Sequence, residues 1–236
     1  MSHSFKFKQF EIDHANCTMK VGTDGVLLGS VVRIENANKI LDIGTGSGLI
    51  ALMLSQKSTA EITGIEIDHE SAETAKVNGK KSPWQDRLHF IQISFQEYYP
   101  KHPSEFDCVV CNPPFFSASL KSPDTLRNIA RHDIQLNSEE LIAGTKAVLK
   151  TSGTAWFIIP LLSVDGFIQI SLQHGLHLKT RTDIFPKTGK KAHRSIVSLT
   201  QEKSGKIITG SLTIRDSNGN FTEEYCKLTS DFYLFF

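Results

Sequence analysis

A run of four residues, Asn112-Pro113-Pro114-Phe115, has the composition of a site that holds an amino group. It follows the apolar segment 106–111, which is typical of a buried strand. Two consecutive prolines remove two backbone donors and cannot continue a helix, so the chain must turn in an extended conformation. The asparagine side-chain oxygen and the proline carbonyl can accept hydrogen bonds from an NH2 group, and Phe115 offers a flat stacking surface. The pattern predicts a site for a planar molecule with an exocyclic amine.

Alternating strands and helices are predicted to position this turn. Apolar strand-like segments lie at 39–43, 62–67, 88–93, 106–111 and 155–159, with helical segments beginning at 49, 69 and 138 between them. Two further strands are expected around 181–185 and 194–200. The alternation predicts an α/β fold with a doubly wound, mainly parallel seven-stranded sheet and helices on both faces. In such sheets, ligands bind beyond the carboxyl ends of the strands.

The two ends of the chain carry weaker signals. Phenylalanines alternate with polar residues in 5–12, which suggests short strands or an extended arm, and 212–215 precedes a hairpin-like turn at Asn218-Gly219. No convincing linker divides the chain. We therefore expect residues 1–236 to form a single domain, with residues 1–30 as an N-terminal cap or arm.

Composition excludes several classes of protein. The chain has 236 residues, of which 39% are hydrophobic and 22% charged, and its net charge of +1 is that of an ordinary globular protein. No apolar run approaches the roughly 18 residues of a membrane span, and no signal peptide is recognisable, so we expect a cytoplasmic protein without membrane association. Cys108 and Cys111 should point to opposite faces of a strand, so no metal site is expected. No obligatory protein partner is inferred.

A glycine-rich turn and a downstream acid predict the cofactor. The run 42–48, Asp-Ile-Gly-Thr-Gly-Ser-Gly, lies between a strand and a helix, where glycines let the backbone approach a ligand. Leu49 stands where the dinucleotide fingerprint would have glycine. Glu66 ends the next strand and can accept both hydroxyls of a ribose, while Asp42 would tolerate a cationic sulfonium better than a diphosphate. The combination predicts S-adenosylmethionine (SAM).

The residues predicted to contact SAM are spread over five segments of the chain. They are Lys20, Thr23, Asp42, Gly44, Thr45, Gly46, Gly48, Glu66, Ile67, Ser94, Phe95 and Asn112. For Thr23 and its neighbour Asp24, an ordinary helix N-cap is an equally good interpretation.

These motifs resemble the class I SAM-dependent methyltransferases that act on amino groups. The resemblance extends over nearly the whole chain, and segments 19–29, 130–133, 185–187 with Arg194, and 221–233 are similar to those of the bacterial tRNA1(Val) adenine-37 N6-methyltransferases. It implies methylation of N6 of adenine 37, beside the anticodon of the tRNA. It also implies that the catalytic residues are Asn112, Pro113, Pro114 and Phe115.

A basic stretch is the candidate RNA surface. Residues 179–206 contain eight lysines and arginines against Asp183 and Glu202, although a solvated loop would show the same pattern. Phosphate attraction predicts RNA contacts there. The residues assigned to RNA are Lys187, Lys190, Lys191 and Arg194, together with Arg131 after the catalytic turn, which could equally be structural.

Other functions use the same planar NH2 chemistry. The alternative is methylation of guanine N2 in rRNA or of a glutamine amide in a protein. A noncatalytic SAM-binding or RNA-binding module is disfavoured by the intact Asn-Pro-Pro-Phe run, and a nicotinamide oxidoreductase by the glycine spacing.

Overall fold

A computed structural model of the protein describes residues 4–15, 17, 20–113, 136–203 and 205–236. The described residues form an eight-stranded sheet with the order β10-β8-β9-β7-β6-β3-β4-β5. Its strands are β3 (Lys39–Ile43), β4 (Glu61–Glu66), β5 (Leu88–Gln92), β6 (Phe106–Cys111), β7 (Leu149–Pro160), β8 (His177–Phe185), β9 (Arg194–Thr200) and β10 (Ile208–Thr213). Strand β9 is antiparallel to both neighbours, and the other neighbouring pairs are parallel. The predicted mainly parallel α/β sheet is confirmed.

The sheet has one strand more than the seven predicted. The additional strand, β10, pairs in parallel with β8 at the edge of the sheet. Its first four residues are exposed, so the segment contains no buried apolar run that would mark it as a strand. A turn does follow at 216–220, where Gly219 adopts a φ of +94° and Arg215 forms a β-bridge with Phe221.

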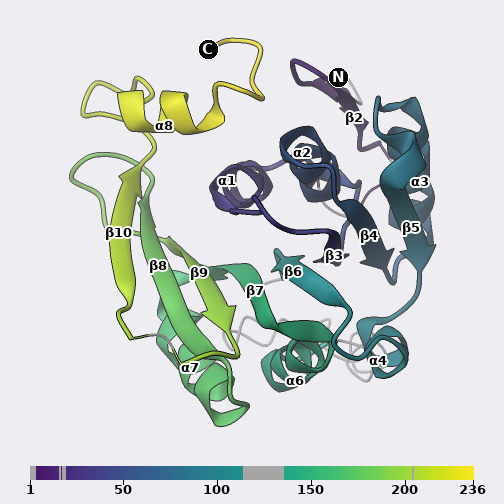
Figure 1. The fold of residues 1–236 in the computed structure, drawn as a ribbon. Coiled ribbons are helices and arrows are strands. Elements are labelled where there is room, and N and C mark those ends of the chain that lie inside the picture. The colour runs from purple at the N-terminus through teal and green to yellow at the C-terminus, as the bar shows by residue number, and fades with distance from the viewer. Residues whose placement is uncertain (1–3, 16, 18–19, 114–135, 204) are drawn as a thin grey trace, which may run out of the picture.

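Helices cover both faces of the sheet. Figure 1 shows α1 and α2 on one face and α6 and α7 on the other. The helices are α1 (Thr23–Val31), α2 (Leu49–Lys57), α3 (His69–Lys81), α4 (Phe95–Tyr98), α6 (Ser138–Val148), α7 (Leu161–Gln173) and α8 (Glu223–Thr229), with short 3-10 turns η1 (Gln85–Arg87) and η2 (Tyr99–Lys101). A capping box begins α6, because Asn137 and Glu140 each accept a hydrogen bond from the other's backbone N–H. No described helix has the length and apolar character to span a membrane.

Two apolar cores lie on the two faces of the sheet. Cys108 packs in the core beneath α1 and α2, whereas Cys111 packs in the core beneath α6 and α7. This confirms that the two thiols point in opposite directions, as strand alternation requires. Burial raises the pKa of both thiols well above the ordinary value, so they behave as small apolar side chains.

The described N-terminal residues pack against the C-terminal segment. Strands β1 (Ser4–Lys6) and β2 (Glu11–Asp13) form a separate antiparallel pair. Phe7 forms an antiparallel bridge with Tyr233, and the Lys8 amide donates to the Phe232 carbonyl at 2.8 Å. The two ends of the chain therefore lie on the same side of the molecule (Figure 1).

Candidate active site

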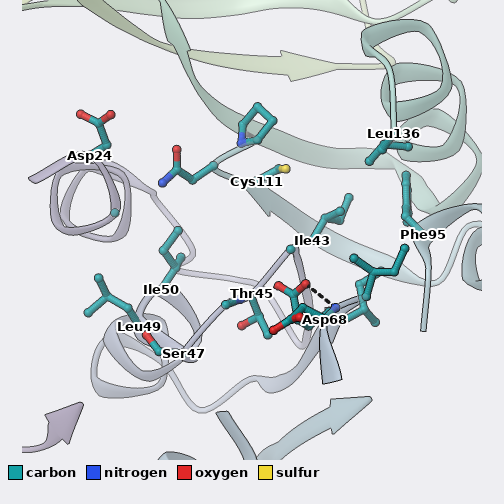
Figure 2. Close-up of a pocket in the computed structure, with 18 of the residues that line it drawn as sticks. Asp24, Ile43, Thr45, Ser47, Leu49, Ile50, Asp68, Phe95, Cys111 and Leu136 are labelled. Carbon is teal, nitrogen blue, oxygen red and sulfur yellow. Dashed lines mark hydrogen bonds between the residues drawn. The ribbon is translucent and has the colours of Figure 1, made fainter. Parts of the chain in front are cut away.

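A cavity of about 820 Å³ lies beyond the carboxyl ends of β3, β4 and β6. That volume lies within the usual range for small-molecule sites. Figure 2 shows Thr45 and Ser47 of the glycine turn below the opening, Asp24 of α1 on one side, and Phe95 and Leu136 on the other. The cavity lies where ligands bind in parallel α/β sheets.

The cavity brings together most of the residues predicted to contact SAM. Ten of the twelve line it: Lys20, Thr23, Gly44, Thr45, Gly46, Glu66, Ile67, Ser94, Phe95 and Asn112. Asp42 and Gly48 do not. Pro113 also lines the cavity, whereas Pro114, Phe115 and Arg131 lie outside the described residues.

The glycine turn has the backbone shape that its sequence predicts. Gly44 and Gly46 have φ values of +66° and +56°, which favour glycine over residues with a side chain. A Cβ at either position would meet no atom within 4 Å, so the backbone faces open space. Gly48 differs, because a Cβ there would lie 3.1 Å from the Phe90 ring. Gly44 and Gly46 thus leave room for a ligand, and Gly48 allows α3 and β5 to pack behind the turn.

Glu66 holds the glycine turn against the end of β4. Its carboxylate accepts hydrogen bonds from the amide N–H groups of Gly46 and Asp68, each at 3.0 Å. Each carboxylate oxygen can accept a further bond, so Glu66 can also receive ribose hydroxyls. Asp68 in turn caps α3 by accepting from the Ser71 amide at 2.9 Å, and the hydrogen bonds from Ser71 lower the pKa of Asp68.

Asp42 lies beneath the turn rather than in the cavity. Strand alternation places its side chain on the same face as Ile40, against α2, where it is fully buried. The Thr45 hydroxyl donates to the Asp42 carboxylate at 2.6 Å. Burial raises the pKa of Asp42 to about 7, although the bond from Thr45 opposes this shift. In the structure Asp42 therefore supports the turn, and its contact with SAM stays a prediction.

The pH dependence of stability tests this position of Asp42. Because the folded-state pKa is raised, the stability that a neutral Asp42 gives is complete below about pH 3.8 and is lost as the pH rises towards 7. Asp42→Asn stays neutral, so its free energy of unfolding relative to the wild type should rise by roughly 2–3 kcal/mol between pH 5 and 7. Denaturant unfolding of the SAM-free protein measures this difference. Asp86→Asn, at an exposed position, is the control, and parallel pH profiles for D42N and the wild type would contradict the assignment.

The segments after β4 and β5 form a second wall. The Ile67 side chain is 49% exposed at the cavity, and Phe95 is buried in the core behind it. Ser94 caps α4, because its hydroxyl accepts from the Glu97 amide at 3.2 Å and donates to the Glu97 carboxylate at 2.8 Å. The exposed face of Ile67 can pack against a planar ring. The Ser94 hydroxyl oxygen can accept one more hydrogen bond, from a polar group at the edge of that ring.

The N-terminal segment closes the cavity from the opposite side. The N-cap of α1 is Gly22, without a side-chain cap bond, so Thr23 and Asp24 do not serve as the N-cap. Both line the cavity. The Arg194 Nε donates to Asp24 Oδ2 at 2.8 Å, and each side chain is 22% exposed. Arg194, which was predicted to bind RNA, therefore also ties the start of β9 to the first turn of α1.

The turn after β6 contains a buried acceptor without a partner among the described residues. Asn112 follows β6 and lines the cavity next to Pro113. Its Oδ1 is buried and has no hydrogen-bond partner among the described residues. Buried polar atoms are normally paired, so an unpaired oxygen in a cavity wall is typical of a group that completes its hydrogen bond with a ligand.

The β8–β9 connection carries three basic residues and one side chain of the cavity wall. Lys187 is half-buried, Lys190 and Lys191 are exposed, and His193 lines the cavity itself. Sequence reasoning did not assign His193 to the site, although it stands within the basic run. Other lining residues that were missed include Val21, Leu49, Ile50, Asp68 and Leu136. Most of these are apolar side chains whose pattern does not distinguish a cavity wall from a core.

Fold and site together define a SAM-dependent methyltransferase, and comparisons with known proteins agree. The family described as Methyltransferase small domain matches residues 16–161. The structure is similar to a predicted O-methyltransferase from Agrobacterium tumefaciens, with a TM-score of 0.71 and 21% identity over 89% of this chain and 96% of that one. SAM is the cofactor of this class, and the open glycine turn fits it.

Two relatives specify the family further. The chain is 41% identical to a protein of Bacteroides fragilis and 39% identical to one of Aeromonas hydrophila, covering 98% of this chain and 97% of each relative. Both relatives are named tRNA1(Val) (adenine(37)-N6)-methyltransferase. The chain belongs to this family.

Proposed function

We propose that the protein transfers the methyl group of SAM to N6 of adenine 37, beside the anticodon of tRNA1(Val). The observation that carries the reaction is the unpaired Oδ1 of Asn112 in the wall of the cavity. The named substrate of two relatives that match nearly the full length of the chain supports the choice of acceptor. A tRNA substrate also favours the cytoplasm as the location.

The residues around the glycine turn are suited to the cofactor. Glu66 is proposed to accept the ribose hydroxyls while it holds Gly46, and Ile67, Ser94 and Phe95 to surround the adenine. The methionine part of SAM is then proposed to contact the remaining predicted residues, Lys20, Thr23, Gly44 and Thr45. SAM supplies a methyl group on a positively charged sulfur, which is a good leaving group.

Asn112 and Pro113 are proposed to hold the acceptor amine. The lone pair of an exocyclic adenine amine is delocalised into the ring, so the amine is a poor nucleophile. Hydrogen bonds from its two hydrogens to Asn112 Oδ1 and the Pro113 carbonyl favour a pyramidal nitrogen whose lone pair faces the methyl group. Alignment of this kind is worth up to roughly 7–11 kcal/mol in favourable systems. Pro114 and Phe115 belong to the same proposed site, with Phe115 stacking on the base.

The N-terminal segment is proposed to cap this site. Residues 20–25 line the cavity, and Asp24 is held by Arg194 from the far part of the chain. These contacts support a single domain over residues 1–236, in which residues 1–30 form the cap.

The anticodon loop is proposed to reach the site across the β8–β9 connection. A base in that loop is already unpaired, so its entry into the pocket costs less than flipping from a duplex. Lys187, Lys190 and Lys191 precede His193, which lines the cavity, in the same connection, and they are proposed to meet the phosphates of the loop. Arg194, which contacts Asp24 of α1, is proposed to bind the RNA as well. Arg131, in the segment after the catalytic turn, is proposed to do the same.

Charge reversal tests the path of the RNA. The double substitution Lys190→Glu and Lys191→Glu should raise KM for tRNA by on the order of 10-fold and reduce the salt dependence of binding, because phosphate contacts are lost. Lys80→Glu with Lys81→Glu is the matched control, since these exposed lysines end α3 at the opposite edge of the sheet. Steady-state kinetics and SAM binding are measured for both pairs. An equal effect of the two double variants would remove the β8–β9 connection from the RNA path.

The choice of substrate class is tested with separate pools of acceptors. The protein is incubated with labelled SAM and purified tRNA, rRNA or protein, and the modified residue is identified. The proposal predicts N6-methyladenosine in tRNA. N2-methylguanosine in rRNA or methylglutamine in a protein would replace the proposed substrate with the alternative that shares the same NH2 chemistry.

A further inference from the structure

A fully exposed leucine stands at the carboxyl edge of the sheet. Leu162, in the first turn of α7, has a relative exposure of 101%, whereas Val164 and Phe167 on the same helix are buried. Strands β6 and β7 are parallel, with Cys111 opposite Phe157, so α7 begins at the same edge as the catalytic turn. An isolated exposed leucine is ordinary, but this one lies at the edge of the sheet at which β6 ends and Asn112 begins the turn.

His193, in the β8–β9 connection, pairs through its backbone with Leu161, the residue before Leu162. The Leu161 amide donates to the His193 carbonyl at 3.1 Å, and Pro160 pairs with Arg194. The ring of His193 is held by Nδ1, which lies 3.2 Å from the Ile184 carbonyl oxygen. A carbonyl can only accept, so Nδ1 carries the hydrogen, and the ring is fixed while it lines the cavity.

The surroundings of this pair favour a nucleotide as the occupant. Lys187, Lys190 and Lys191 stand in the same connection as His193. A flat ring and an exposed aliphatic side chain can cover the faces of a base, and nearby ammonium groups can hold its phosphates. This combination matches single-stranded nucleic acid better than an uncharged partner.

We propose that Leu162 and His193 form a stacking platform for a nucleotide adjacent to the target adenine. The inference rests on the proposed function and names a contact that the catalytic turn does not supply. Drawing the target base into the pocket removes one stacking partner from each of its neighbours in the loop. A rigid platform at the rim replaces that partner and keeps the loop in the orientation in which the target base enters the site.

An anticodon stem-loop with single abasic sites tests the platform. Binding is measured with S-adenosylhomocysteine present, for the intact loop and for loops that lack the base at position 36 or 38. Loss of the stacked base should weaken binding to the wild type by on the order of 10-fold. Leu162→Ala should bind the intact loop about as weakly as the wild type binds the abasic loop. The variant should lose no further affinity with the abasic loop, since the two changes remove the same contact. Leu172→Ala, at an exposed position near the other end of α7, should behave like the wild type.

Two histidine variants separate stacking from local structure. His193→Asn retains a donor for the Ile184 carbonyl but lacks the ring, and His193→Phe retains a ring without that donor. Stacking predicts weak loop binding for H193N and binding close to the wild type for H193F. The platform would be overturned if H193N bound the loop more tightly than H193F, or if L162A lost as much affinity with the abasic loop as the wild type does. Normal methylation of tRNA by the wild type would leave the proposed function intact in either case. Failure of the wild type to bind or methylate any tRNA would overturn both.

Discussion

Replacing Asn112 with alanine should lower kcat for methyl transfer by on the order of 100- to 1,000-fold, as does removal of other preorganised hydrogen-bonding groups that act on the reacting atoms. The buried Oδ1 of Asn112 has no partner among the described residues, so its removal should leave the fold and SAM binding nearly unchanged. Single-turnover methylation of tRNA with saturating SAM measures the chemical step.

Two comparisons make the Asn112 result specific. Isothermal titration of Asn112→Ala should give a Kd for SAM close to that of the wild type, because Asn112, although it is one of the residues predicted to contact SAM, is proposed to act mainly on the acceptor amine. Asn38→Ala is a matched control, because Asn38 is an exposed asparagine before β3 at the amino edge of the sheet. A normal kcat for N112A would remove Asn112 from the reaction, and a loss of SAM binding equal to the loss of kcat would make it a cofactor residue.

Replacing Glu66 with alanine should weaken SAM binding by on the order of 100-fold. The change removes the hydrogen bonds that hold the Gly46 and Asp68 amides and leaves the ribose hydroxyls without an acceptor. Hydrogen bonds to charged groups contribute about 1.5–3 kcal/mol each, so the loss of two bonds from the ribose hydroxyls, at about 1.5 kcal/mol each, gives roughly the expected factor. Glu66→Gln keeps one acceptor oxygen, so its Kd for SAM should lie between those of the wild type and Glu66→Ala.

Glu61 supplies the control for this prediction. It lies at the other end of the same strand, where it pairs with His89 and its side chain is 56% exposed. Glu61→Ala should leave the Kd for SAM unchanged. If both substitutions weaken SAM equally, the effect belongs to the strand as a whole, and the specific role of Glu66 is wrong.

The sequence was informative wherever a residue type is required by backbone geometry or burial. Apolar runs located the central strands β3, β4 and β6, and the positive φ values of Gly44 and Gly46 explain the glycines between β3 and α2. The edge strand β10 was missed because an exposed strand needs no apolar run.

The exact neighbours of each polar group could not be predicted from the sequence. Asp42 looked like a pocket acid, yet strand alternation turns it under the turn, towards Thr45. Arg194 looked like a phosphate ligand, but its partner, Asp24, lies 170 residues away in the chain. His193 reaches the cavity through the pairing of β9 with β7 and β8, which local patterns do not reveal.

The central claim is that the protein methylates N6 of adenine 37 in tRNA1(Val). The most direct measurement incubates the protein and SAM with unmodified tRNA1(Val), and with the same tRNA carrying guanine at position 37, and then maps methylated nucleosides by mass spectrometry. We expect one N6-methyladenosine, at position 37 of the first tRNA, and none in the second. Methylation at another position, equal methylation of both tRNAs, or no methylation of either would contradict it.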